Sequence, residues 1–93
     1  MNEQEGRDLL YEHLKEYRGR PYGALVALLD RPQVAEVTGP SGTKYQLEVQ
    51  VFWDGPRQGN VRVLGSIDDG GLRAFVPLTD SFIMAPNGVF VGE

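Results

Sequence analysis

The segment TKYQLEVQVFW, residues 43–53, alternates polar and apolar side chains along its length. Successive side chains of a β-strand point to opposite faces of a sheet, so this period of two predicts a strand with one buried and one outer face. The buried set is Tyr45, Leu47, Val49, Val51 and Trp53, and the outer set is Lys44, Gln46, Glu48, Gln50 and Phe52. Because this strand is the clearest in the chain, its neighbours are assigned by pairing with it.

Two neighbouring segments pair with this strand. VAEV at 34–37 precedes it across the turn-rich GPSGT, residues 39–43, and an alternating segment at 61–67 follows it across DGPRQGN, residues 54–60. Keeping the apolar sets on one face predicts two antiparallel hairpins with fixed registers. The predicted pairs are Val37 with Tyr45, Ala35 with Leu47, Trp53 with Val61, Val51 with Val63, and Leu47 with Ile67.

A third hairpin is predicted around SIDDGGLRAF, residues 66–75. Aspartate bonds to its own turn amides and glycine adopts positive φ without steric cost, so DDGG at 68–71 is typical of a four-residue turn. The alternating Asp/Asn pattern of a calcium loop with its terminal Glu is missing, which favours the turn over a metal site. The predicted pairs are Ile67 with Leu72, Gly65 with Ala74, Val63 with Val76, and Val61 with Leu78.

The N-terminal part is predicted to be helical. Leu10, Leu14 and Tyr17 recur at spacings of four and three, which predicts an amphipathic helix over about 3–18 with Asn2 as its N-cap. YGALVALLD at 22–30 fits either a buried strand or a short buried helix. A helix is favoured, because Pro21 suits a first turn and the segment is rich in Ala and Leu.

Together these elements predict one α+β domain over residues 1–93. One or two N-terminal helices pack on one face of a four- to five-stranded antiparallel meander sheet over about 34–91. Asn87-Gly88 is a strong turn signal and predicts one or two further short strands at an edge of the sheet.

The composition excludes several classes of protein. The formal charge of −4 opposes a nucleic-acid-binding role, and the absence of cysteine removes disulfides and thiolate metal sites. The N-terminus is charged, and no stretch approaches the ~20 apolar residues of a membrane-spanning helix. We expect a cytoplasmic protein with no membrane or nucleic-acid partner and no cofactor or metal.

The outer face of the predicted sheet carries more apolar side chains than a solvated face needs. The predicted register places Phe52 by Pro77 and Leu64 beside Phe75. A contiguous group of this kind is a candidate association surface for a partner protein or a second copy of the chain. A competing interpretation is that the apolar C-terminal segment, with Phe82, Ile83, Met84 and Phe90, folds over this face as a second small core.

A second hypothesis is a small-ligand or minor hydrolase site at the sheet end, built from Trp53, Asp54, Asp69 and Arg73. His13 is the only histidine, and nothing in the chain signals a nucleophile beside it, so no catalytic residue is assigned. The lack of a catalytic constellation favours a non-enzymatic protein-interaction module that uses the outer sheet face.

Two segments resemble the sequences of a family of small bacterial proteins of unknown function. They are GPSGTKYQLEVQVFWD at 39–54 and SIDDGGLRAFVPLTDSFIMAPNGVFVGE at 66–93. The resemblance covers roughly residues 39–93, which form the predicted sheet. It implies a bacterial cytosolic α+β domain, and it carries over no functional residues.

Overall fold

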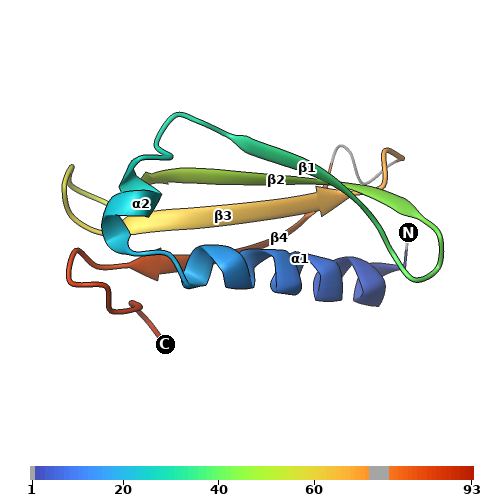
Figure 1. The fold of residues 1–93 in the computed structure, drawn as a ribbon, viewed down its shortest axis with the longest axis horizontal. Helices are drawn as coiled ribbons and strands as arrows, with labels where there is room; N and C mark the ends of the chain where they lie inside the picture. Colours follow the sequence, from blue (N-terminus) through green and yellow to red (C-terminus); the bar gives the residue numbers. More distant parts are fainter. Residues whose placement is uncertain (1, 72–75) are drawn as a thin grey trace.

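The structure is a computed structural model, and it describes residues 2–71 and 76–93. The four strands form one antiparallel sheet in the order β1-β2-β3-β4, and helix α1 lies along it and packs on β3 and β4 (Figure 1). The predicted α+β meander is confirmed. The elements are α1 (Glu3–Arg18), α2 (Tyr22–Val26), β1 (Gln33–Thr38), β2 (Lys44–Trp53), β3 (Val61–Asp68) and β4 (Leu78–Met84).

Helix α1 has the predicted bounds and the predicted cap. The Glu5 N–H donates to Oδ1 of Asn2 over 3.1 Å, which satisfies one of the free amides of the first turn. Leu10, Leu14 and Tyr17 are all buried, so the apolar stripe faces the sheet.

Helix α2 is shorter than the predicted helix over 22–30. It ends at Val26, and the Leu29 N–H then donates to the Val26 carbonyl over 3.1 Å. This bond spans three residues, as in a 3₁₀-helix, and makes a tighter turn than the α-helix before it. Asp30 then adopts φ of +60°. Leu29 forms a parallel bridge to Val51 at the sheet edge, so pairing with β2 replaces continuation of the helix.

The first two hairpins have the predicted registers. Val37 lies opposite Tyr45 and Trp53 lies opposite Val61, with loops over 39–43 and 54–60. The inward residues of β2 from Tyr45 to Val51 are buried. The period of two therefore identified the buried face correctly.

The third hairpin differs from the prediction. The observed pairs are Ile67 with Leu78, Gly65 with Asp80, Val63 with Phe82, and Val61 with Met84, in place of Leu72, Ala74, Val76 and Leu78. The predicted pairs are wrong by six residues, because the observed register buries Phe82 and Met84 to 3% exposure each. It also leaves Pro77, which has no N–H to donate, ahead of the strand.

The local turn chemistry at 68–71 is nevertheless as predicted. Oδ1 of Asp68 accepts from the Gly70 N–H over 2.8 Å, and Oδ1 of Asp69 accepts from the Gly71 N–H over 3.1 Å. Gly70 adopts φ of +83°. The turn therefore starts a longer connection, which reaches β4 only at Leu78. Residues 72–75, on which part of the predicted hairpin falls, lie outside the described residues.

The C-terminal tail, residues 85–93, forms a small hairpin at the edge of β4. The predicted turn at Asn87-Gly88 is present, since the Ala85 N–H donates to the Val89 carbonyl over 2.9 Å and Met84 bridges to Phe90. The Phe90 ring packs edge-on against Phe82, at 5.7 Å between centroids, on the core side. The tail is therefore no cover for the outer face, and the interpretation as a second core is wrong.

Candidate functional site

One row of side chains crosses the outer face of the sheet at the end where β2 stops. The register aligns Phe52, Arg62 and Ile83 on neighbouring strands, and the Val91 N–H donates to the Ile83 carbonyl over 2.9 Å. Phe52 is 40% exposed and Val91 39% exposed, and Ile83 is partly exposed. We call Phe52, Ile83 and Val91, with the Arg62 stem between them, the outer apolar row.

Arg62 is held in place by polar contacts on both sides. Its Nε donates to Oδ1 of Asp54 over 3.2 Å, and its Nη1 donates to Oγ of Ser81 over 3.3 Å. The charge of the guanidinium is therefore balanced by Asp54. The methylene groups of Arg62 can then line the row between Phe52 and Ile83 as apolar surface.

The next row is more polar than predicted. It consists of Gln50, Leu64 and Ser81, so Ser81 rather than Phe75 lies beside Leu64. Ile83 likewise takes the place predicted for Pro77 in the row of Phe52. Both predicted neighbours are wrong, because they depended on the mistaken register of β4. Phe75 itself lies outside the described residues.

At the opposite end of the outer face, three carboxylates outnumber one exposed lysine, Lys44. Glu36, Glu48 and Asp68 come from three adjacent strands and all point to the outer side. Near them lies a hollow of about 300 Å³, lined by Val34, Gln46, Leu47, Glu48, Ser66, Asp68 and Pro77. The outer face thus combines an apolar end with an acidic end.

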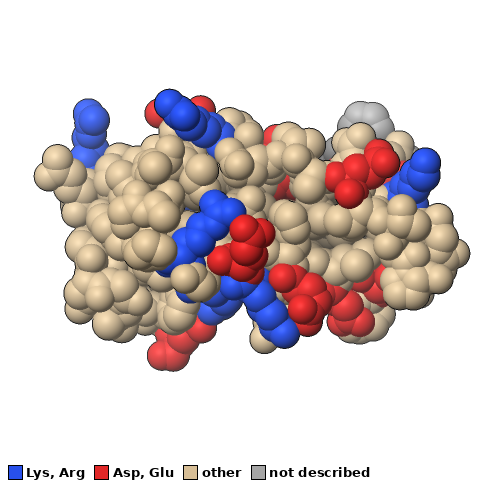
Figure 2. Space-filling model, viewed as in Figure 1, with Lys and Arg blue, Asp and Glu red and all other residues tan. Residues whose placement is uncertain are grey.

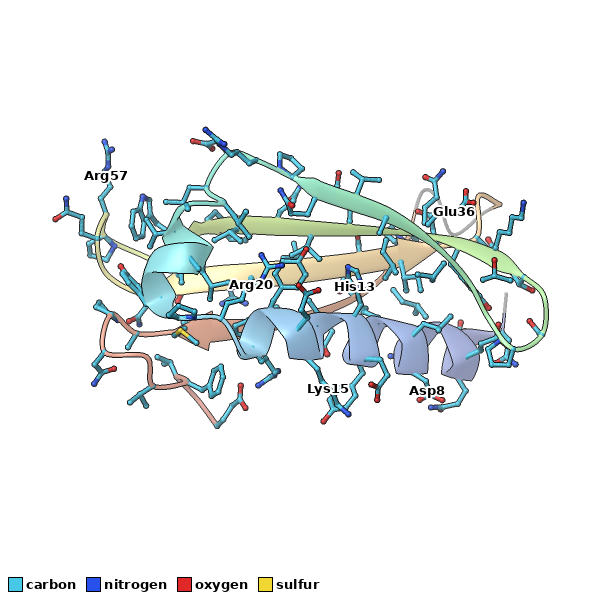
Figure 3. All side chains as sticks on the ribbon, viewed as in Figure 1. Asp8, His13, Lys15, Arg20, Glu36 and Arg57 are labelled. Atoms are coloured by element: carbon cyan, nitrogen blue, oxygen red, sulfur yellow. The ribbon has the colours of Figure 1, made fainter. Side chains whose placement is uncertain are left out.

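The second predicted site is not brought together. β2 and β3 are antiparallel, so Trp53 and Asp54 follow one end of the sheet, whereas Asp69 follows β3 at the other end. In Figure 3, Arg57 marks the first end and Glu36 lies toward the second. Arg73 lies outside the described residues.

The electrostatics of Asp69 suit a turn residue. The Gly71 N–H that bonds to it holds the pKa of this carboxyl below its ordinary value. A carboxyl with a lowered pKa stays ionised at neutral pH and is a poor general acid.

The described residues hold no cluster of metal-ligating side chains. In residues 2–71 and 76–93, no group of three or more His, Cys, Asp or Glu side chains could hold a metal ion. His13 points from α1 toward the sheet, and its ring packs 5.7 Å from that of Tyr17 (Figure 3). On the face that carries α1, acidic and basic side chains are interspersed rather than separated (Figure 2). None of the described helices is both long enough and apolar enough to cross a bilayer.

Sequence reasoning missed Ile83 and Val91 as outer-face residues. Phe82, Ile83 and Met84 are consecutive and apolar, so the alternation that marked β2 is absent there. The Asn87-Gly88 turn was the available signal, because it places Val91 next to Ile83.

Comparisons with known proteins add no assignment: no family model, curated protein or solved structure matches the chain. The resemblance to a bacterial family therefore stays a prediction.

Proposed function

We propose that this chain is a non-enzymatic protein-binding domain. Its outer sheet face docks a partner that presents apolar side chains at one end of the contact and Lys or Arg at the other. The observation that carries the proposal is the outer apolar row, Phe52, Ile83 and Val91, which no described segment covers.

The arrangement of layers explains why this row is uncovered. Helix α1 packs on the buried face of β3 and β4, and the tail lies beside the edge of β4. Burying one large apolar side chain of the row under a partner would contribute about 1.5–3 kcal/mol. Clustered apolar side chains that are exposed in a monomer are typical of interaction surfaces.

The size and charge of the face indicate the kind of partner. The molecule extends 39 Å by 21 Å along its two longest axes, which leaves room for the ~800 Å² that one partner contributes to a standard interface. Glu48 and Asp68 beside the hollow favour a partner with basic side chains at the matching position.

The test is site-specific photo-crosslinking followed by a binding measurement. A photoreactive amino acid replaces Gln50, which is exposed on the outer face next to Leu64. A second chain carries it at Tyr11, which is 54% exposed on helix α1. We expect a partner to be captured from position 50 and not from position 11.

The captured partner is then purified and its affinity measured by calorimetry. We expect Ile83→Glu to weaken binding about 10- to 100-fold and Tyr11→Glu to leave it unchanged. Glu48→Lys should also weaken binding, and added salt should weaken binding to the wild type. Equal capture from both positions, or an affinity that Ile83→Glu does not change, would contradict the proposal.

A further inference from the structure

Strand β1 is an edge of the sheet, and no described strand lies beyond it (Figure 1). The Gly39 N–H donates to the Thr43 carbonyl opposite it, over 2.8 Å. Main-chain groups alternate in direction along a strand, so Gln33, Ala35 and Val37 bond to β2. The N–H and C=O groups of the even-numbered residues, Val34, Glu36 and Thr38, therefore face the open edge.

The two edges of the sheet are protected differently. At β4, the tail bonds to the edge through Val91 and Ile83, and Pro77 precedes the strand. β1 is likewise preceded by a proline, Pro32, but no described segment bonds to its open edge. The strand itself contains no Pro, Lys or Arg, its register with β2 runs without a bulge, and Val34 is 69% exposed. Natural proteins usually protect a free edge with lysine, proline, a bulge or a covering segment, because a free edge otherwise pairs with another strand.

We propose that β1 pairs antiparallel with β1 of a second copy, which joins the two sheets into one continuous sheet. The occupant is another β1 because this edge is complementary to itself. A two-fold axis perpendicular to the sheet keeps both outer faces on the same side and sets even-numbered residues against even-numbered residues. Each such pair exchanges two main-chain hydrogen bonds.

Charge and main-chain chemistry select the register. A pairing centred on Glu36 would set this carboxylate opposite its symmetry mate, which is unfavourable. A pairing centred on Val34 would set Glu36 opposite Pro32, which has no N–H. A pairing centred on Ala35 avoids the like-charge pair, because it places Val34 of one copy opposite Glu36 of the other. It also moves Pro32 to the end of the paired segment, opposite Thr38, so the two central Val34–Glu36 pairs keep all of their hydrogen bonds.

The main experiment is sedimentation velocity over a wide concentration series with a proline variant on each edge. Val34→Pro removes an N–H that faces the open edge and keeps every β1–β2 bond. Thr79→Pro is the matched control. The Ile83 carbonyl bonds to the tail, so by the same alternation the Thr79 N–H faces the open edge of β4. One strand buries less area than a standard interface, so the dimer should dissociate on dilution. We expect wild type and Thr79→Pro to reach twice 10.3 kDa at high concentration, and folded Val34→Pro to stay monomeric.

A charge pair tests the register and does not depend on the folding of a proline variant. Val34→Glu places a carboxylate opposite Glu36 of the second copy and should weaken the dimer, whereas Val34→Lys places an ammonium there and should strengthen it. A wild type that stays monomeric, a folded Val34→Pro that stays dimeric, or identical behaviour of the Glu and Lys variants would overturn the proposal. Ile83→Glu should leave the dimer intact; a dimer that it abolishes would instead lie on the outer face, and this outcome too would overturn pairing through β1.

Discussion

Arg18 at the end of helix α1 binds Glu93 in the tail, with its Nη1 2.9 Å from both Oε1 and Oε2. The same guanidinium lies over the rings of Phe82 and Phe90, at 4.9 and 5.3 Å from their centroids. One side chain therefore connects the helix, the edge strand and the tail, and it holds the tail beside β4.

Arg18→Ala should lower the free energy of unfolding by about 1–2 kcal/mol, because it removes two cation–π contacts and a partly exposed ion pair. Urea denaturation of the wild type and the variant measures the difference. The control is Arg7→Ala. Nη2 of Arg7 lies 3.9 Å from Oε2 of Glu3 on the exposed surface of the same helix, so this variant removes only an exposed ion pair. Equal losses in both variants would show that the position of Arg18 is not special.

Gly65→Ala should destabilise the fold by about 1–2 kcal/mol, through overpacking of the core. A Cβ at this position would lie 2.9 Å from Cδ1 of Leu10 and 3.0 Å from Cδ2 of Leu14, and both leucines are buried. Thermal and urea unfolding measure the effect. Gly23→Ala is the control, because its Cβ would meet nothing within 4 Å. Alanine also favours a helix, so Gly23→Ala should be neutral or stabilising, and a neutral Gly65→Ala would contradict the close packing.

Tyr45→Phe should stabilise the protein by about 1 kcal/mol. The Tyr45 hydroxyl is buried without a well-formed hydrogen bond to any described residue, and burial, followed by the neighbouring Glu5 carboxylate, raises the pKa of Tyr45. Removing an unsatisfied buried hydroxyl removes its desolvation penalty. Urea denaturation tests this expectation, and a loss of stability would instead mean that the hydroxyl bonds to Glu5 in solution.

The ion pair between Glu16 and Arg20 should make stability depend on pH. The hydrogen bond and charge of Arg20 hold the pKa of Glu16 below its ordinary 4.5. A lowered folded-state pKa contributes stability that is present above about pH 4.5 and is lost as the pH falls through the lowered value. Wild type should therefore exceed Glu16→Gln in stability at neutral pH, and the difference should vanish in acid. An NMR titration that places the Glu16 pKa at or above 4.5 would contradict this.

The local pattern was sufficient for most of the fold. Alternation in 43–53 identified the buried face of β2, and the neighbouring loops were short enough to leave one register for Val37 with Tyr45 and for Trp53 with Val61. The cap at Asn2 and the apolar spacing of α1 were equally local signals. In each case residues close in sequence make the contacts that decide the structure.

The candidate site depended on a choice that is not local. Shifting β4 by an even number of residues keeps its apolar side chains on the same face, so the pattern cannot distinguish Leu72 from Leu78 as the partner of Ile67. The predicted neighbours of Phe52 and Leu64 were wrong for that reason.

The sequence by itself determined the fold class, the order of the strands and the faces of β2, because these follow from side-chain periodicity and short turns. Only the tertiary structure decided that Ile83 and Val91 join Phe52 on the outer face. Burial of Phe82 and Met84 against the core outweighs the shorter turn at 68–71, and that balance depends on contacts between residues distant in the chain.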